Sequence, residues 1–179
     1  MKNTVKSLII ASSISLAQAE TFILDFQYSP SLGIYEEQIG VGFYYYNLNS
    51  TGFYLNLSTS RGDPDEYYSN DDLDISGPNY AVLDTSSYVT IFNIGATRQF
   101  NDWLYLYAGL GIAGTEVYTD SALRIGNTVL TYDNIRDSSE DETSLNVNFG
   151  THIIVKEVAI NLGFNSFTAS PVIGIGYNF

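Results

Sequence analysis

Very few side chains in this sequence could do acid–base or metal chemistry. His152 is the single histidine and there is no cysteine, so a hydroxyl nucleophile or a transition-metal site would have to use His152. Asp25 lies in a strand-like segment whose alternation places it on the same side as Gln27. A buried carboxylate needs a cation or several hydrogen-bond donors, and His152 and Lys156 are candidates, whereas alternation turns Arg98 outward. An internal polar cluster is the simpler interpretation, and a proton or ion relay is the alternative.

A second candidate site is the tripeptide Arg61-Gly62-Asp63, which resembles an integrin-binding motif. It lies before Pro64 at the start of an acidic stretch, and a tripeptide of this kind also occurs by chance. The acids that follow lack the spacing of an EF-hand loop. We expect at most weak divalent-cation binding there, of the kind that bridges to lipid phosphates.

The first residues have the layout of a secretory signal. Lys2 and Lys6 precede the apolar run "SLIIASSISLA", and Ala17-Gln18-Ala19 provides a small-x-small cleavage site. We therefore predict a cleaved signal peptide at 1–19 and one domain at 20–179. The processed chain would carry 5 basic and 20 acidic residues, a net charge of 5 − 20 = −15, which disfavours nucleic acid as a partner.

The remaining chain alternates between apolar and polar residues in eight segments. They span residues 21–28, 38–47, 52–60, 88–100, 103–114, 144–156, 158–167 and 171–179. One face is continuously apolar, while the other carries Asn, Gly, Tyr and Gln with almost no Lys or Glu. A soluble sandwich would expose charges on its second face, whereas a small barrel fills its interior with neutral groups. Lipid permits sheets only when they close, so we predict an all-β fold, an eight-stranded antiparallel up-and-down transmembrane β-barrel.

The polar face defines two sets of predicted lumen residues. The lumen polar network is predicted to contain Asp25, Gln27, Asn93, Asn146, Asn148, His152, Lys156 and Asn161. The lumen plug is predicted to contain Tyr44, Tyr46, Tyr54, Tyr105 and Tyr107. Glycines alternate with these residues and leave space that tyrosine rings from neighbouring strands would occupy. We therefore expect a lumen filled by side chains and no stable open channel.

Short and long connections alternate along the chain, which is typical of periplasmic turns and extracellular loops. The long acidic connections at 62–87 and 116–143 hold seven acids each and are predicted to be extracellular. Gly126-Asn127 lies between two strand-like runs, which indicates a hairpin that would extend the barrel strands above the membrane. Outward aromatic residues are expected at the periplasmic rim. These are Phe22, Tyr45, Phe53, Phe100, Tyr177 and Phe179.

The last segment, "PVIGIGYNF", resembles the signal read by the barrel-assembly machinery, with Gly174, Tyr177 and Phe179 as its matching residues. Val172 stands where that pattern usually has a polar residue. Together with the strand pattern, this segment resembles the small eight-stranded outer-membrane barrels, the group of the OmpA transmembrane domain, OmpX and Ail.

The resemblance implies location in the outer membrane of a Gram-negative bacterium and a structural or surface-interaction role similar to adhesion. A narrow solute channel is the alternative, and a lipid-modifying enzyme is the third possibility, although His152 lies nearer the periplasmic end than the outer rim where such barrels do chemistry. We expect no cofactor, metal or catalytic residue. The expected partners are outer-membrane lipids, lipopolysaccharide bridged by divalent cations, the barrel-assembly machinery and an extracellular partner whose identity the sequence does not reveal.

Overall fold

A computed structural model describes residues 20–32, 35–48, 50–60, 68–69, 80–125, 128–136 and 141–179. The strands are β1 (Glu20–Ser29), β2 (Gln38–Asn47), β3 (Gly52–Ser60), β4 (Tyr68–Ser69), β5 (Tyr80–Gln99), β6 (Leu104–Ile125), β7 (Thr128–Arg136), β8 (Glu142–Val155), β9 (Val158–Asn165) and β10 (Ser170–Asn178). No helix within these ranges is long and apolar enough to cross a membrane.

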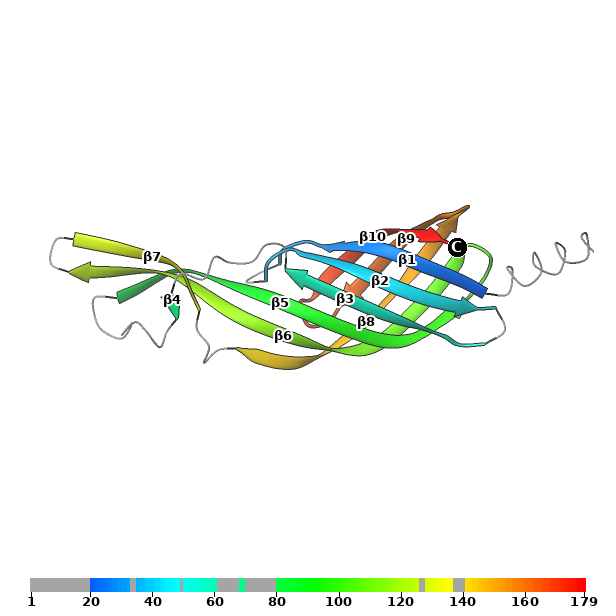
Figure 1. The fold of residues 1–179 in the computed structure, drawn as a ribbon, viewed down its shortest axis with the longest axis horizontal. Helices are drawn as coiled ribbons and strands as arrows, with labels where there is room; N and C mark the ends of the chain where they lie inside the picture. The colour runs from blue at the N-terminus through cyan, green and yellow to red at the C-terminus, as the bar shows by residue number, and fades with distance from the viewer. Residues whose placement is uncertain are drawn as a thin grey trace, which may run out of the picture.

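Eight of these strands close into an antiparallel barrel. Their order is β6-β5-β3-β2-β1-β10-β9-β8, and the pairing of β8 with β6 completes the circle. The first and last strands pair along their length, with Leu24 opposite Tyr177 and Gln27 opposite Gly174. Figure 1 shows the tilted wall that results from this closure. The predicted fold class is therefore confirmed.

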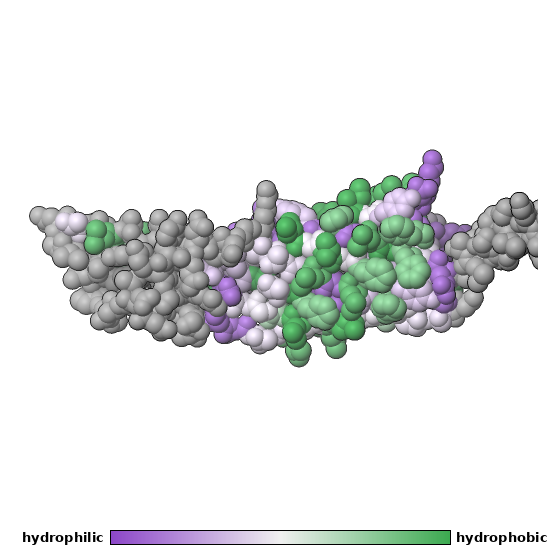
Figure 2. Space-filling view, viewed as in Figure 1, coloured by the Kyte–Doolittle hydropathy of each residue, from purple (hydrophilic) through white to green (hydrophobic). Residues whose placement is uncertain are grey.

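Side chains alternate between a buried inner face and an exposed outer face on every barrel strand. On β3 the burial pattern switches at each residue from Gly52 to Ser60. Asp25 is fully buried, while its neighbour Phe26 is 65% exposed. The exposed side chains are large and apolar, and Figure 2 shows them spread over the barrel body. Because the apolar side points outward and the polar side inward, the outer wall is suited to lipid.

Aromatic side chains gather on the outer wall near the end where β1 begins and β10 ends. Phe22 packs against Tyr45 with ring centroids 5.0 Å apart, and Tyr45 packs against Phe53 at 5.5 Å. Tyr177 and Phe179 lie at 4.8 Å. The short turns on this end identify it as the periplasmic side, where an aromatic belt is expected.

Three strands extend beyond the barrel wall at the opposite end, within the segments predicted as long extracellular connections. The pairing of β5 with β3 stops at Thr90, yet β5 and β6 remain paired as far as Tyr80 and Leu123. Residues 80–87, 116–125 and 128–136 of these predicted connections are therefore strand, because the strands continue to pair with each other above the wall. β7 pairs with the end of β6, with Ile125 opposite Thr128. The hairpin predicted between them is confirmed, although its two turn residues lie outside the described ranges.

We call the part of β5 and β6 above the wall, together with β7, the extracellular extension; it comprises residues 80–89, 116–125 and 128–136. Figure 1 shows it projecting from the barrel at the end opposite the C-terminus. β4 pairs with β7 through Tyr68 and Ile135 and is not part of the barrel wall.

Candidate functional site

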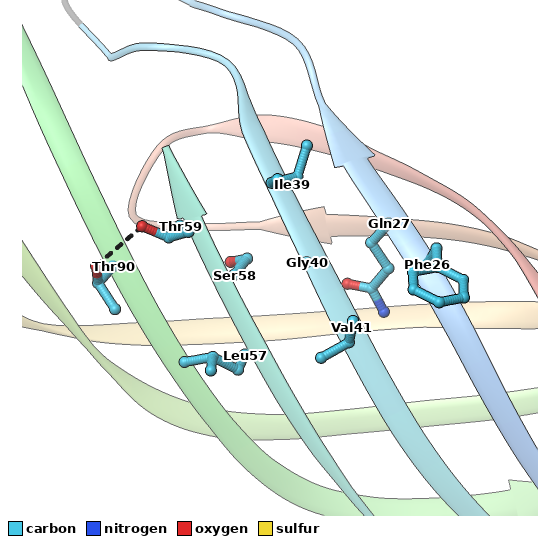
Figure 3. Close-up of a pocket in the computed structure, with 9 residues that line it drawn as sticks. All are labelled: Phe26, Gln27, Ile39, Gly40, Val41, Leu57, Ser58, Thr59 and Thr90. Atoms are coloured by element: carbon cyan, nitrogen blue, oxygen red, sulfur yellow. Dashed lines mark hydrogen bonds between the residues drawn. The ribbon is translucent and has the colours of Figure 1, made fainter. Parts of the chain in front are cut away.

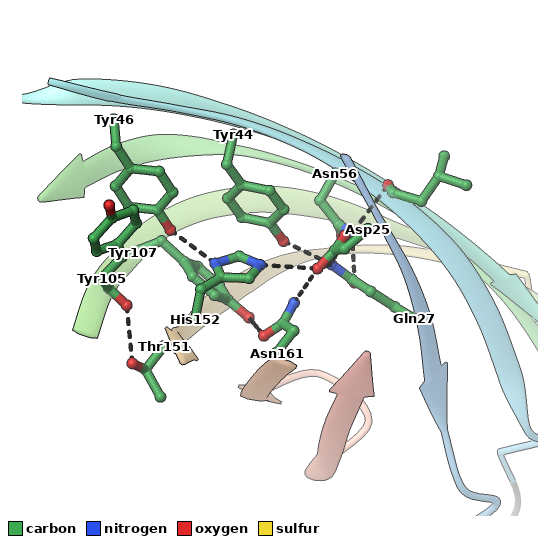
Figure 4. A network of polar contacts seen from close by, with 11 residues as sticks. Asp25, Gln27, Tyr44, Tyr46, Asn56, Tyr105, Tyr107, Thr151, His152 and Asn161 are labelled. Atoms are coloured by element: carbon green, nitrogen blue, oxygen red, sulfur yellow. Dashed lines mark hydrogen bonds and ion pairs between the residues drawn. The ribbon is translucent and has the colours of Figure 1, made fainter. Parts of the chain in front are cut away.

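The centre of the lumen is organised around the carboxylate of Asp25, which is fully buried. Gln27 Nε2 donates to Asp25 Oδ1 at 3.0 Å, and Asn161 Nδ2 donates to Asp25 Oδ2 at 2.5 Å. His152 Nε2 lies 3.0 Å from the same Oδ2. Figure 4 shows these groups converging from β1, β8 and β9. The charge of a buried carboxylate is stabilised by donors of this kind, which supply what water would provide outside.

His152 links Asp25 to Tyr46. When Asp25 is ionised its carboxylate only accepts hydrogen bonds, and the Nε2 of His152 then carries the proton and donates to it. The Nδ1 of His152 is 2.8 Å from the Tyr46 hydroxyl, which donates to it when the ring is neutral. All three side chains are fully buried. The Asp–His–Tyr arrangement has the order of a catalytic triad, but its burial indicates a structural hydrogen-bond chain.

Glycines on both neighbouring strands make room for this carboxylate. Asp25 lies opposite Gly42 on β2 and opposite Gly176 on β10. A β-carbon on Gly42 would lie 2.5 Å from Asp25 Oδ1, and one on Gly176 would lie 2.7 Å from the Asp25 β-carbon. The Asp25 side chain therefore requires glycine at both inward positions, 42 and 176.

A chain of side-chain amides leads to Asp25 from the extracellular half of the lumen. Asn146 donates to Asn93 at 2.7 Å, and Asn93 donates to Asn56 at 3.0 Å. Asn56 donates to Gln27 at 2.7 Å, and Gln27 donates to Asp25. Every amide in the chain points its NH₂ group toward the carboxylate. Aligned dipoles of this kind polarise one another and favour the negative charge at their end.

Tyrosine rings lie across glycines of neighbouring strands on the inner wall. Tyr54 of β3 is opposite Gly95 of β5, Gly95 is opposite Gly109 of β6, and Gly109 is opposite Asn148 of β8. The Tyr54 hydroxyl donates to the Asn148 side-chain oxygen at the end of this row. Since Tyr54 occupies the space above both glycines, a side chain at either position would collide with the ring.

Tyr107 repeats the arrangement on the other side of the lumen. It lies opposite Gly150, which is opposite Gly163, and its hydroxyl occupies the space that a β-carbon on either glycine would need. The same hydroxyl donates to Asn161 Oδ1 at 2.9 Å. Tyr107 thereby fixes one of the residues that donate to Asp25.

The predicted plug tyrosines form one cluster in the periplasmic half of the lumen. Tyr44 stacks on Tyr54 with centroids 5.3 Å apart and packs against Tyr107 at 5.0 Å. Tyr46 contacts Tyr105 at 4.8 Å. All five tyrosines are buried to within 5% relative exposure, and they share a cluster with Ile23, Ile154 and Ala159.

Apolar side chains cover the extracellular end of the lumen. Val89, Ile91 and Ala113 are buried together, and Tyr35 and Phe167 pack against them with their own rings 5.4 Å apart. Tyr35 belongs to the connection between β1 and β2, which bridges to β5 at Ser87. This group had no counterpart among the predicted lumen residues, because Tyr35 lies in a connection and β9 ends at Asn165, before Phe167 of the predicted segment 158–167.

The structure places the two cations that the sequence offered as neighbours of Asp25, Lys156 and Arg98. Lys156 does not join the lumen network: β8 ends at Val155, and Lys156 is exposed in the turn before β9 with φ = 59°. The alternation that would have turned Lys156 inward ends with the strand. Arg98 points outward as alternation predicts.

Asn56 and Asn165 join the lumen polar network, although they were not among its predicted members. The signal that could have found them is their position on the polar face of alternating strands.

The residues predicted as an assembly signal lie where the last strand closes the barrel. Gly174 faces inward between Gln27 of β1 and Asn161 of β9, and Tyr177 and Phe179 are exposed on the outer rim. The predicted signal peptide at 1–19 and the tripeptide at 61–63 lie outside the described ranges.

The outer wall contains a groove over Gly40 in its extracellular half. The groove is about 550 Å³ and is bordered by Phe26, Val41, Leu57 and Thr59. Figure 3 shows its lining residues on β1, β2, β3 and β5. Its walls are almost entirely apolar, so it suits a hydrocarbon chain without selecting a headgroup.

No protein-family model and no curated protein sequence matches this chain. Among solved structures it is similar to Ail, the attachment invasion locus protein of Yersinia pestis, with 14% identity, a TM-score of 0.56, and coverage of 90% of this chain and 99% of that one. Ail in complex with the heparin analogue sucrose octasulfate gives 15% identity, a TM-score of 0.55 and the same coverage. Ail in a phospholipid bilayer nanodisc gives 15% identity and a TM-score of 0.53, again with that coverage. The fold is thus that of the small eight-stranded outer-membrane barrels.

Proposed function

We propose that this protein is an outer-membrane surface-interaction protein whose extracellular extension contacts a partner outside the cell. The observation that carries the proposal is the extension itself. β5 and β6 continue as a paired ribbon well beyond the residues that build the wall, and β7 adds a third strand to it. Strands of this length are not needed to cross a membrane, which takes about 9–11 residues, whereas β6 has 22.

A filled lumen supports a surface role over transport. The tyrosine cluster occupies the periplasmic half, the amide chain crosses the middle, and the apolar group that includes Ile91 covers the extracellular end. Eight strands enclose an interior that side chains can fill. We therefore infer a barrel that acts as a rigid support for its extension and conducts no ions.

The position of His152 supports the same choice over lipid chemistry. Its two ring nitrogens are engaged by Asp25 and Tyr46, and the side chain is fully buried. A hydroxyl nucleophile at the lipid-facing rim could not reach it. This geometry favours a structural histidine.

The charge of the extracellular segments indicates the chemistry of the partner. Residues 62–87 and 116–143 contain 14 acids and only Arg124 and Arg136 as bases. The Ail complex contains a heparin analogue, a polyanion, which these acids would repel. We infer instead a partner with a basic surface, or phosphate groups of lipopolysaccharide bridged by divalent cations. We further propose that Gly174, Tyr177 and Phe179 are read by the barrel-assembly machinery.

Removal of the outer part of the extension tests this function. We expect bacteria that display a variant lacking residues 120–140, with a short turn in their place, to lose retention on cultured epithelial cells and immobilised basic matrix proteins. The variant should still show heat-modifiable gel migration, because the deleted residues lie above the wall pairings. Retention by the intact protein should weaken as salt is raised, since charge attraction is screened.

A matched control removes one acid from the opposite end of the barrel. Glu157→Gln lies in the periplasmic turn between β8 and β9 and should leave retention unchanged. Equal retention by the intact and deleted proteins, with both folded at the surface, would contradict a surface-interaction role.

A further inference from the structure

A second groove on the outer wall differs from the one over Gly40 because it ends at a cation. Four outward residues form a row across neighbouring strands: Phe53 is opposite Ala96, Ala96 is opposite Ala108, and Ala108 is opposite Phe149. The two small alanines between two exposed phenylalanines leave a hollow in the wall. Together with its surroundings this groove measures about 870 Å³.

Arg98 closes the periplasmic end of this alanine groove. It lies two residues beyond Ala96 on β5, next to the end of the strand, and it is exposed on the lipid side. Its paired neighbour is Leu106, and Thr51 lines the groove beside it. Among the described residues no carboxylate forms an ion pair with Arg98. Among the described residues of the wall strands, Arg98 is the one basic outward side chain.

A cation in this position needs an anion from the membrane. An arginine facing lipid is tolerated near the interface, where its guanidinium can reach polar groups. Phe100 and Trp103 of the adjoining turn are both exposed, which places Arg98 at the level of the periplasmic aromatic belt. Guanidinium binds phosphate through two parallel hydrogen bonds, and lipid phosphates lie at this level.

We propose that the alanine groove and Arg98 form a binding site for one anionic phospholipid of the periplasmic leaflet. The phosphate is held by Arg98 with the Thr51 hydroxyl beside it, and one acyl chain lies in the hollow over Ala96 and Ala108. A zwitterionic lipid binds less well because its own ammonium competes for the phosphate. This site depends on the membrane location of the barrel and is independent of the surface role of the extension.

The only tryptophan of the chain, Trp103, reports on lipids at this rim. The full protein is folded into phosphatidylcholine vesicles that contain increasing fractions of brominated phosphatidylglycerol. Parallel series contain brominated phosphatidylethanolamine or brominated phosphatidylcholine instead. Quenching of Trp103 fluorescence is measured in each series. We expect the relative binding constant for phosphatidylglycerol to exceed those of the zwitterionic lipids about 5-fold, the preference expected for one cation near a membrane surface. Arg98→Gln should reduce this ratio to near one.

Two further variants separate the site from general electrostatic attraction. Lys156→Gln removes the other exposed cation among the described residues of the periplasmic end and should leave the ratio nearly unchanged. Ala108→Leu fills the hollow with a side chain like its neighbours Leu106 and Leu110, and it should lower the ratio while the barrel still folds. An unchanged ratio in Arg98→Gln, or an equal loss in Lys156→Gln, would overturn the site. An unchanged ratio in Ala108→Leu would overturn the placement of the acyl chain.

Discussion

Asp25→Asn is expected to lower the free energy of unfolding by about 3 kcal/mol, because buried donors that lose a charged acceptor keep their desolvation cost without the compensating hydrogen bonds. The substitution preserves the shape of the side chain but replaces one carboxylate oxygen, a hydrogen-bond acceptor, by an NH₂ donor. The new donor would face three groups that themselves donate to Asp25, those of Gln27, His152 and Asn161. The measurement is the urea midpoint of folding into liposomes, followed by heat-modifiable gel migration, with the m-value checked for constancy.

Control variants show whether the loss belongs to the hydrogen bonds of the buried carboxylate. Asp102→Asn removes an acid from the exposed periplasmic turn and should change stability by less than about 0.5 kcal/mol. His152→Gln should be costly alone, and the double variant with Asp25→Asn should lose at least about 1 kcal/mol less than the sum of both singles. Additive losses, or a midpoint for Asp25→Asn equal to that of the unmodified protein, would contradict a lumen organised around this carboxylate.

Gly109→Ala is the second substitution with a large expected effect, a loss of about 3 kcal/mol, at the upper end for overpacking. A β-carbon on Gly109 would collide with the backbone oxygen of Ile94, the hydroxyl of Tyr54 and the Cα of Gly95, the last at 2.7 Å. Two of these atoms belong to the backbone of β5, so β5 and β6 would have to separate. The same urea titration measures the loss.

Gly114→Ala is the matched control on the same strand. A β-carbon on Gly114 would have no neighbour within 4 Å, so the variant should unfold within about 0.5 kcal/mol of the unmodified protein. Equal midpoints for the two alanine variants would show that the tyrosine rings do not require the inward glycines.

The sequence predicted which side chains face the lumen because a strand has a side-chain period of two. Asp25, His152 and the five tyrosines were assigned to the inner face by counting along single strands. Lys156 shows the limit of this counting, because alternation holds only within a strand. β8 ends at Val155, and Lys156 is a turn residue with a left-handed backbone conformation.

The contacts between strands were beyond reach of the sequence. The register between strands decides which inward side chains meet, and no single strand encodes it. This register places Tyr54 over Gly95 and Gly109 and joins four amides into one chain to Asp25. The extracellular cover needed Tyr35 and Phe167 to be placed from irregular connections. The hairpin at Gly126-Asn127 predicted an extension above the wall, but the length over which β5 and β6 stay paired after their outer neighbours have ended depends on the register between them.

The filled lumen is tested most directly by the conductance of the purified, refolded protein in planar bilayers. Because Tyr44, Tyr46 and Tyr105 are buried together on the periplasmic side, and Ile91 is buried at the other end, we predict no steady unitary conductance from the intact barrel. Steady unitary conductance that changes in Tyr46→Ala or Asp25→Asn would show an ion path through these residues and would contradict the account.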